Sequence, residues 1–75
     1  MGTLPEEVRT ARRLPSPDLA RAIRRAAGVS QVRMGIELGV HRLTIARWES
    51  GERAPQGARR TAYAALLEQL REASA

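Results

Sequence analysis

The 75-residue chain contains no cysteine, lysine, asparagine or phenylalanine. Without cysteine, neither disulfide bonds nor a cysteine-based zinc site can supplement the core of so small a protein. The single histidine, His41, has no second histidine or cysteine with which to share a metal ion. The core must therefore come from leucine, isoleucine, valine and the only tryptophan, Trp48.

Long apolar segments are also absent. No run approaches the roughly 18 residues of a membrane span, and no signal-peptide segment follows Met1. We therefore expect a cytoplasmic protein of a bacterial or phage-infected cell. No Gly-rich phosphate loop and no recognisable nucleophile–base motif is present, so the sequence predicts no enzyme, no cofactor and no small-molecule substrate.

The charge of the chain is strongly positive. All 13 basic residues are arginine, against 8 acidic residues, which gives a net charge of +5 and a pI of about 11.5. The replacement of lysine by arginine fits the codon bias of a GC-rich genome and carries no functional message. The positive sign does carry one, because a pI above about 9 is typical of small domains that bind nucleic acid.

The central stretch, SQVRMGIELGVHRLTIARWESGERAP, contains two short helical patterns. Ser30 is a natural N-cap for a helix over Gln31 to Leu38, and Gly39 supplies a left-handed turn. A second helix is predicted from about His41 to Glu49, with Gly51 after it. Two helices joined by a tight glycine turn form a helix-turn-helix unit, whose second helix enters a DNA groove.

Helices are also expected on both sides of this unit. Ser16, Pro17 and Asp18 predict a helix start, and Gly28 predicts its end. A final helix runs from Gln56 to about Arg71, and residues 72–75 are expected to fray. Its wide apolar face serves either the core or a dimer contact, and consists of Ala62, Tyr63, Leu66, Leu67 and Leu70.

The predicted core draws on every one of these helices. In the first helix, Leu19, Ile23 and Ala26 or Ala27 form the inward stripe. Gly35 lies in mid-helix, where glycine costs about 1 kcal/mol relative to alanine, so we expect a close helix crossing there. The full set of predicted core residues is Leu19, Ile23, Met34, Leu38, Ile45, Trp48 and Leu66.

Residues 1–15 are predicted to be separate from the domain over residues 16–75. This N-terminal arm is basic near its end and has a thin apolar stripe, so it is either a flexible tail or a short helix over about Pro5 to Arg13. Its arginines could reach a DNA backbone or minor groove, as the arms of some DNA-binding domains do. A solvated tail is the simpler interpretation.

The runs GVSQ, MGIELGV and TIARWESGERAP resemble the Cro/C1-type (XRE) helix-turn-helix family of phage and bacterial repressors. The resemblance covers roughly Leu19 to Leu70. The ordered positions that carry it are Ser30, Gln31, Met34, Gly35, Gly39, Val40, Ile45, Trp48, Glu49, Gly51, Arg53 and Pro55. It implies an all-α, lambda-repressor-like bundle of four to five helices, sequence-specific binding of double-stranded DNA, and usually two copies on a palindromic site.

The resemblance also implies roles for single residues. The base-facing positions are matched by His41, Arg42, Leu43 and Arg47. The backbone-facing positions are matched by Gln31, which would also brace the next helix, and by Thr44 and Arg53. Arg24 matches a basic residue that pairs with Glu49. Val32 and Arg33 stand where the family commonly has acidic residues, so we expect Arg33 to add a cation near the DNA backbone.

The side-chain chemistry of these residues can be considered apart from the family resemblance. Arg42 and Arg47 suit the O6 and N7 atoms of guanine, whereas Leu43 suits either a thymine methyl or plain solvent exposure. His41 is expected to contact a base or phosphate, to cap its helix, or to be solvated. Trp48 is expected in the core, because one aromatic residue makes no stacking platform for single strands.

Two functions remain open from the sequence. The first is a nucleoid-associated transcriptional regulator, most simply a repressor, that reads the major groove with residues 41–49. The second is a protein-interaction module, such as an antitoxin or an adaptor for a polymerase or phage protein, that uses the apolar face of the last helix.

Overall fold

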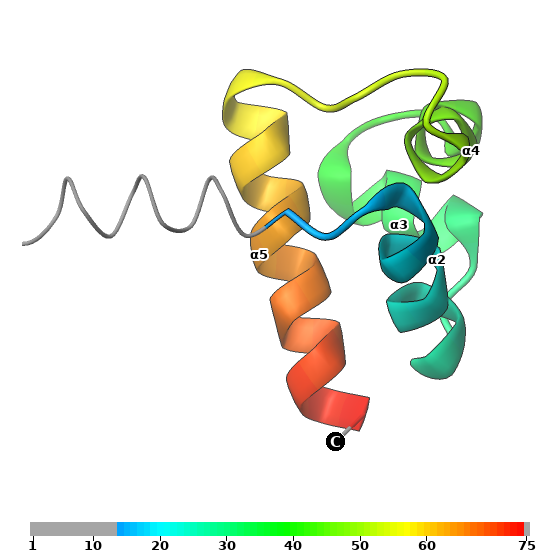
Figure 1. The fold of residues 1–75 in the computed structure, drawn as a ribbon, viewed down its shortest axis with the longest axis vertical. Helices are drawn as coiled ribbons and strands as arrows, with labels where there is room; N and C mark the ends of the chain where they lie inside the picture. Colours follow the sequence, from blue (N-terminus) through cyan, green and yellow to red (C-terminus); the bar gives the residue numbers. More distant parts are fainter. Residues whose placement is uncertain (1–13, 75) are drawn as a thin grey trace, which may run out of the picture.

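Four helices make up most of residues 14–74, the part of the chain that the computed structural model describes (Figure 1). They are α2 (Pro17–Ala26), α3 (Gln31–Leu38), α4 (Arg42–Ser50) and α5 (Gly57–Ser74). No strand occurs within these residues, so the predicted all-α fold is confirmed. The expected arm, with its helix over Pro5 to Arg13, lies almost wholly outside the described residues.

Helix α2 begins where its capping residues predict. The Oγ atom of Ser16 accepts a hydrogen bond from the backbone N–H of Leu19 at 3.2 Å, and Pro17 occupies the first helical position. Asp18 lies in the first turn, where a negative charge is favourable next to the helix dipole. The helix ends at Ala26, two residues before Gly28, which has a φ of +71°.

Helices α3 and α4 form the helix-turn-helix unit. The Oγ atom of Ser30 caps α3 by accepting from the N–H of Arg33 at 3.0 Å. Gly39 ends α3 in the left-handed conformation, with a φ of +68°, which a residue with a side chain adopts only at a cost. The N–H of Val40 then bonds back to the carbonyl oxygen of Gly35 at 2.9 Å, which closes the turn.

Gly35 is required by this turn. A Cβ atom at this position would lie 2.5 Å from the carbonyl oxygen of Val40 and 3.4 Å from the backbone nitrogen of Arg42. The close approach that the sequence indicated is therefore made by the backbone that links α3 to α4, rather than by the side chains of a crossing helix. The missing side chain lets the two helices meet at a tight angle.

The core lies where α2 packs against α4 and α5, and where α3 packs against α4 and α5. Its buried members are Ala20, Ile23, Met34, Ile45, Trp48, Tyr63 and Leu67, with Leu38 and Leu66 partly buried beside them. The rings of Trp48 and Tyr63 pack with their centroids 4.8 Å apart. This contact joins the helix-turn-helix unit to α5.

The prediction of Leu19 as a core residue is wrong, because its side chain is 43% exposed. The inward face of α2 consists of Ala20, Ile23 and the partly buried Arg24, which lie at helical spacing on one side. A small residue at position 20 lets α2 approach its neighbours, and Leu19 is then turned to the edge. Of the two alternatives Ala26 and Ala27, Ala26 is exposed and Ala27 is half-buried.

Two expectations about α5 are also wrong. The helix does not fray after Arg71 but continues to Ser74. Ala62 is exposed, and the buried positions are Tyr63, Ala64 and Leu67. The apolar face of α5 is thus mostly used by the core, and it leaves Ala62 and the edges of Leu66 and Leu70 open to solvent.

Candidate nucleic-acid interface

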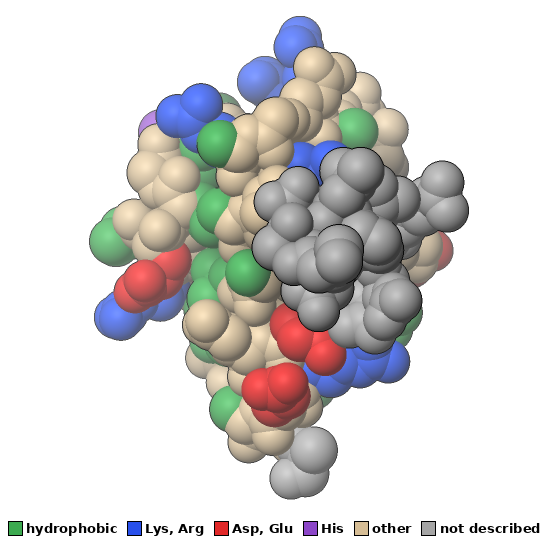
Figure 2. Space-filling view, turned by 90° about the vertical axis from the view of Figure 1, so that its left-hand side faces the viewer, with side chains coloured by type: hydrophobic (Ala, Val, Ile, Leu, Met, Phe, Trp, Pro, Cys, Tyr) green, Lys and Arg blue, Asp and Glu red, His purple; other side chains and the backbone are tan. Residues whose placement is uncertain are grey.

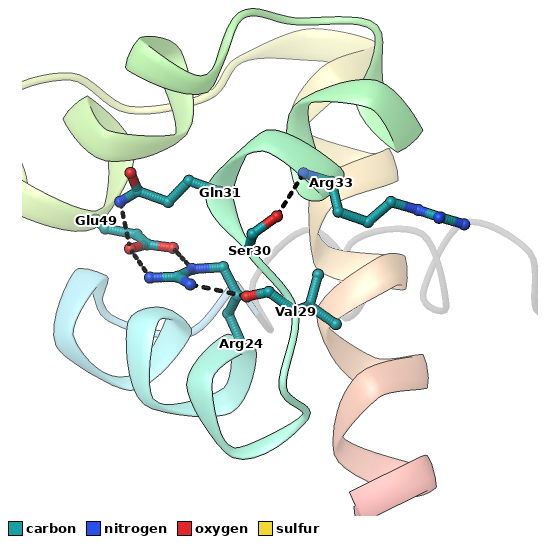
Figure 3. A network of polar contacts seen from close by, with 6 residues as sticks. All are labelled: Arg24, Val29, Ser30, Gln31, Arg33 and Glu49. Atoms are coloured by element: carbon teal, nitrogen blue, oxygen red, sulfur yellow. Dashed lines mark hydrogen bonds and ion pairs between the residues drawn. The ribbon is translucent and has the colours of Figure 1, made fainter.

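A buried ion pair fixes how the helix-turn-helix unit sits on the rest of the domain (Figure 3). Arg24 of α2 and Glu49 of α4 pair through Nε and Oε2 at 2.6 Å and through Nη2 and Oε1 at 3.0 Å. The third guanidinium nitrogen, Nη1, donates to the carbonyl oxygen of Val29 at 2.8 Å. The side chains are only 11% and 2% exposed, and the hydrogen bonds to Glu49 raise the pKa of Arg24.

Gln31 joins the same network from the first turn of α3. Its Nε2 atom donates to Oε1 of Glu49 at 3.1 Å (Figure 3). The carboxylate of Glu49 therefore accepts hydrogen bonds from α2 and α3 while belonging to α4. The bracing role expected of Gln31 is present in the structure, with its amide bonded to a residue in the last turn of α4.

Helix α4 has one buried side and one exposed side. Ile45, Trp48 and Glu49 face inward, and Ile45 is completely inaccessible. Arg42, Leu43 and Arg47 face outward and are exposed. Because α4 is held on its inner side by packing and by the Glu49 network, its outer side projects as a rigid ridge that carries two guanidinium groups.

His41 is the N-cap of α4. Its Nδ1 atom accepts a hydrogen bond from the N–H of Leu43 at 3.0 Å, with the backbone of His41 extended. A neutral imidazole that accepts at Nδ1 carries its proton on Nε2. Of the alternatives open from the sequence, the structure shows the cap, and the ring still has an N–H donor for an anion.

The loop after α4 is folded back onto the end of the helix. The carbonyl oxygen of Arg47 accepts from Oγ of Ser50 at 3.1 Å and from the N–H of Arg53 at 3.2 Å. Gly51, with a φ of +81°, allows this reversal. Arg53 is thereby placed beside Arg47, at the end of α4 opposite to His41.

A model of the helix-turn-helix family HTH_3 matches residues 21–68, which is more than half of the chain. The chain belongs to this family. The Cro/C1-type resemblance is therefore confirmed, and the chain is a DNA-binding helix-turn-helix domain. Searches among curated proteins and among solved structures returned no match.

The HTH_3 domain brings most of the predicted contact residues to one side. His41, Arg42 and Leu43 lie at the start of α4, and Arg47 and Arg53 lie at its end. Gln31 lies beside α4 and contacts Glu49 in its last turn. Thr44 is half-buried on the flank of α4. Figure 2 views the molecule from the α5 side, and there arginine side chains, and no acidic ones, lie at the upper end, where α5 begins.

Arg33 is not brought together with these residues. Its Nη2 atom pairs with Oε1 of Glu37 at 2.9 Å, one turn further along α3. In Figure 3 its side chain points away from Glu49. It borders a groove shared with Met34, Leu66 and other residues of α3 and α5, on the side of α3 away from Arg42. The i,i+4 spacing of Arg33 and Glu37 was the signal that could have identified this pair.

Sequence reasoning also missed Glu52. Its Oε2 atom lies 3.2 Å from Nε of Arg47, and both side chains are more than half exposed. An exposed pair of this kind contributes little to stability, about 0 to 1 kcal/mol, so Arg47 can exchange it for another acceptor. Glu52 thus holds Arg47 beside the cleft that Arg53 and Arg59 also line.

The described residues contain no group of three or more side chains of the metal-binding types placed to hold an ion. None of the described helices is both long and apolar enough to cross a membrane.

Proposed function

We propose that this domain is a sequence-specific transcriptional regulator, most simply a repressor, that places α4 in the major groove of double-stranded DNA. The observation that carries the proposal is the outward side of α4, where Arg42, Leu43 and Arg47 are exposed above a buried Trp48 and Glu49. The excess of positive charge supplies the attraction to the DNA backbone.

Two arginines and one leucine would read the bases. Arg42 and Arg47 are five residues apart, about one and a half turns, so their side chains spread from one helix onto neighbouring base pairs. Each guanidinium matches the O6 and N7 atoms of a guanine, a contact worth about 1–3 kcal/mol of discrimination. Leu43 lies between them and fits against the methyl group of a thymine.

The backbone contacts come from both ends of α4. Gln31, held by Glu49, presents its amide beside α4, and His41 offers its Nε2 proton at the start of that helix. Arg53 acts at the other end, and Thr44 on the flank. These contacts position the domain on the duplex without reading its sequence.

Regulators of this architecture commonly act as two copies on a palindrome, and we propose the same here. The centres of the two half-sites would then lie about 34 Å apart, one turn of the double helix. The proposal places the protein in the cytoplasm, at the nucleoid of a bacterial or phage-infected cell.

The test is a selection of duplexes from a random pool, followed by binding measurements on the selected and scrambled sequences over a range of salt concentrations. We expect one enriched motif and an affinity that falls linearly on a log–log plot against salt. A chain that enriches no motif and binds no duplex would overturn the proposal. A stoichiometric protein partner found in that case would favour the interaction-module alternative, with the open edges of Leu66 and Leu70 as its surface.

A further inference from the structure

Helix α2 exposes a pair of arginines next to the helix-turn-helix unit. Arg21 and Arg25 are four residues apart on one side of α2, and both are exposed. They line a surface cleft together with Ser30 and Gln31 at the start of α3 and with Arg42 at the start of α4. Three elements of the fold thus converge on one small space beside the ridge of α4.

The arginine charge in this cleft is not compensated by ion pairs among the residues that the structure describes. Within residues 14–74, neither Arg21, Arg25 nor Arg42 forms an ion pair, whereas Arg24, Arg33 and Arg47 each have a carboxylate partner. Among the described residues, Glu49 supplies the one carboxylate that lines the cleft. It is buried, and both of its oxygens already accept hydrogen bonds from Arg24 or Gln31.

Such a cleft suits an anion with several oxygen atoms. A guanidinium donates through a planar fork that matches phosphate oxygens, and two forks from successive turns of α2 can share one phosphate. The first turn of α3 adds the positive end of a helix dipole at the same place. Because Arg42 also borders the cleft, a phosphate held there belongs to the strand beside the groove that α4 enters.

We propose that Arg21 and Arg25 of α2 bind a backbone phosphate of the DNA, as a site additional to the contacts of the helix-turn-helix unit. The inference rests on the proposed function, and it adds to the DNA-binding surface a helix, α2, that is not part of the helix-turn-helix unit. The site holds the DNA strand at the start of α4, and Arg42 reaches from its edge to a base.

The first experiment compares Arg21→Gln and Arg25→Gln with Arg71→Gln in the full chain. Arg71 is exposed in the last turn of α5 and does not line the cleft, and its replacement removes the same charge. We expect each α2 variant to bind the selected and the scrambled duplex about tenfold more weakly than the parent. This is the effect of losing one charge-assisted hydrogen bond. The slope of log affinity against log salt should become shallower by up to about 0.9. Arg71→Gln should change both quantities much less.

The second experiment locates the phosphate. The selected duplex is made with a neutral methylphosphonate at one position at a time, and each version is titrated with the parent chain and with Arg25→Gln. We expect one position, at the edge of a half-site, where the neutral group weakens the parent but not the variant. If the effects of the neutral phosphate and of Arg25→Gln on affinity are not additive at that position, Arg25 contacts that phosphate. A general loss of charge would weaken binding without such coupling to one position.

The outcomes separate the two proposals. If the parent binds the selected duplex but the α2 variants behave like Arg71→Gln, or no phosphate position couples to Arg25, the α2 site is overturned and the proposed function stands. If the parent binds no duplex, both are overturned. Melting temperatures equal to that of the parent show that the variants are folded, since both arginines are exposed.

Discussion

The guanidinium of Arg24 donates to both carboxylate oxygens of Glu49, at 2.6 and 3.0 Å, across a separation of 25 residues. The pair joins α2 to α4. The carbonyl oxygen of Val29, in the loop after α2, accepts a third hydrogen bond from Arg24. One buried pair therefore sets the angle between α2 and α4, and with it the exposure of the arginine ridge.

Removal of one partner should destabilise the domain strongly. Arg24→Ala leaves the Glu49 carboxylate buried without its counter-charge, and we expect a loss of about 3–5 kcal/mol in the free energy of unfolding. Thermal and urea denaturation measure it. Replacement of the exposed Arg25 by alanine is the control and should change stability by less than about 0.5 kcal/mol. An unchanged melting temperature for Arg24→Ala would show that the pair is structurally dispensable.

Gly35→Ala should be destabilising, although alanine is the better helix former by about 1 kcal/mol. The added Cβ would meet the carbonyl oxygen of Val40 at 2.5 Å, and backbone atoms of a tight turn cannot yield without separating α3 from α4. We expect a net loss of about 1–3 kcal/mol, measured by urea denaturation. Ile36→Ala, at a neighbouring position that is 70% exposed, is the control and should be nearly neutral. Equal stability of Gly35→Ala and the parent would mean that the turn can move.

Tyr63→Phe should leave the domain as stable as the parent or make it more stable. The ring of Tyr63 is buried against Trp48, but its hydroxyl is buried without a hydrogen-bond partner among the described residues. A buried hydroxyl in that state costs about 1–3 kcal/mol of desolvation, and phenylalanine keeps the ring packing without that cost. A loss above 1 kcal/mol on chemical denaturation would reveal that the hydroxyl has a partner, such as a bound water.

The same hydroxyl predicts how stability depends on alkaline pH. Burial, and then the negative charge of Glu49, raise the pKa of Tyr63 from 10.0 to about 12. Since the folded state favours the neutral phenol, this contribution is complete below pH 10 and is lost as the pH rises to 12, by up to about 3 kcal/mol. Denaturation at pH 9 and pH 11.5 should show a larger loss for the parent than for Tyr63→Phe. Parallel losses would indicate a phenol that ionises freely in the folded protein.

These comparisons show which parts of the structure the sequence could predict. Caps act over three residues, so Ser16, Ser30 and Gly39 mark the ends of helices without any knowledge of the fold. Burial depends on which side of a helix meets its neighbours, and for Leu19 the hydrophobic pattern gave the wrong side. Ala20 is a better fit because a methyl group allows close packing, a property that depends on tertiary distance.

The candidate nucleic-acid interface shows the same distinction between features set by local sequence and features set by tertiary packing. The pairing of Arg24 with Glu49 came from the family resemblance, because no local pattern connects residues 25 positions apart. Arg33 was expected at the DNA, but its partner Glu37 lies one turn away, and the side of α3 that carries them faces away from Arg42. The cleft of Arg21 and Arg25 arises only when α2 is placed beside the start of α3, so composition could not reveal it.

The roles proposed along α4 differ in what a substitution should do to sequence preference. Arg42→Ala or Arg47→Ala removes a base contact, so binding to the selected duplex should fall by about ten- to a hundredfold while binding to scrambled DNA changes less. Arg53→Ala removes a phosphate contact, so both duplexes should be weakened alike and the salt slope should become shallower by about 0.9. Fluorescence anisotropy on the two duplexes at several salt concentrations distinguishes the patterns. Equal losses on both duplexes for Arg42→Ala would move this residue from the bases to the backbone, where it would share the phosphate held by Arg21 and Arg25.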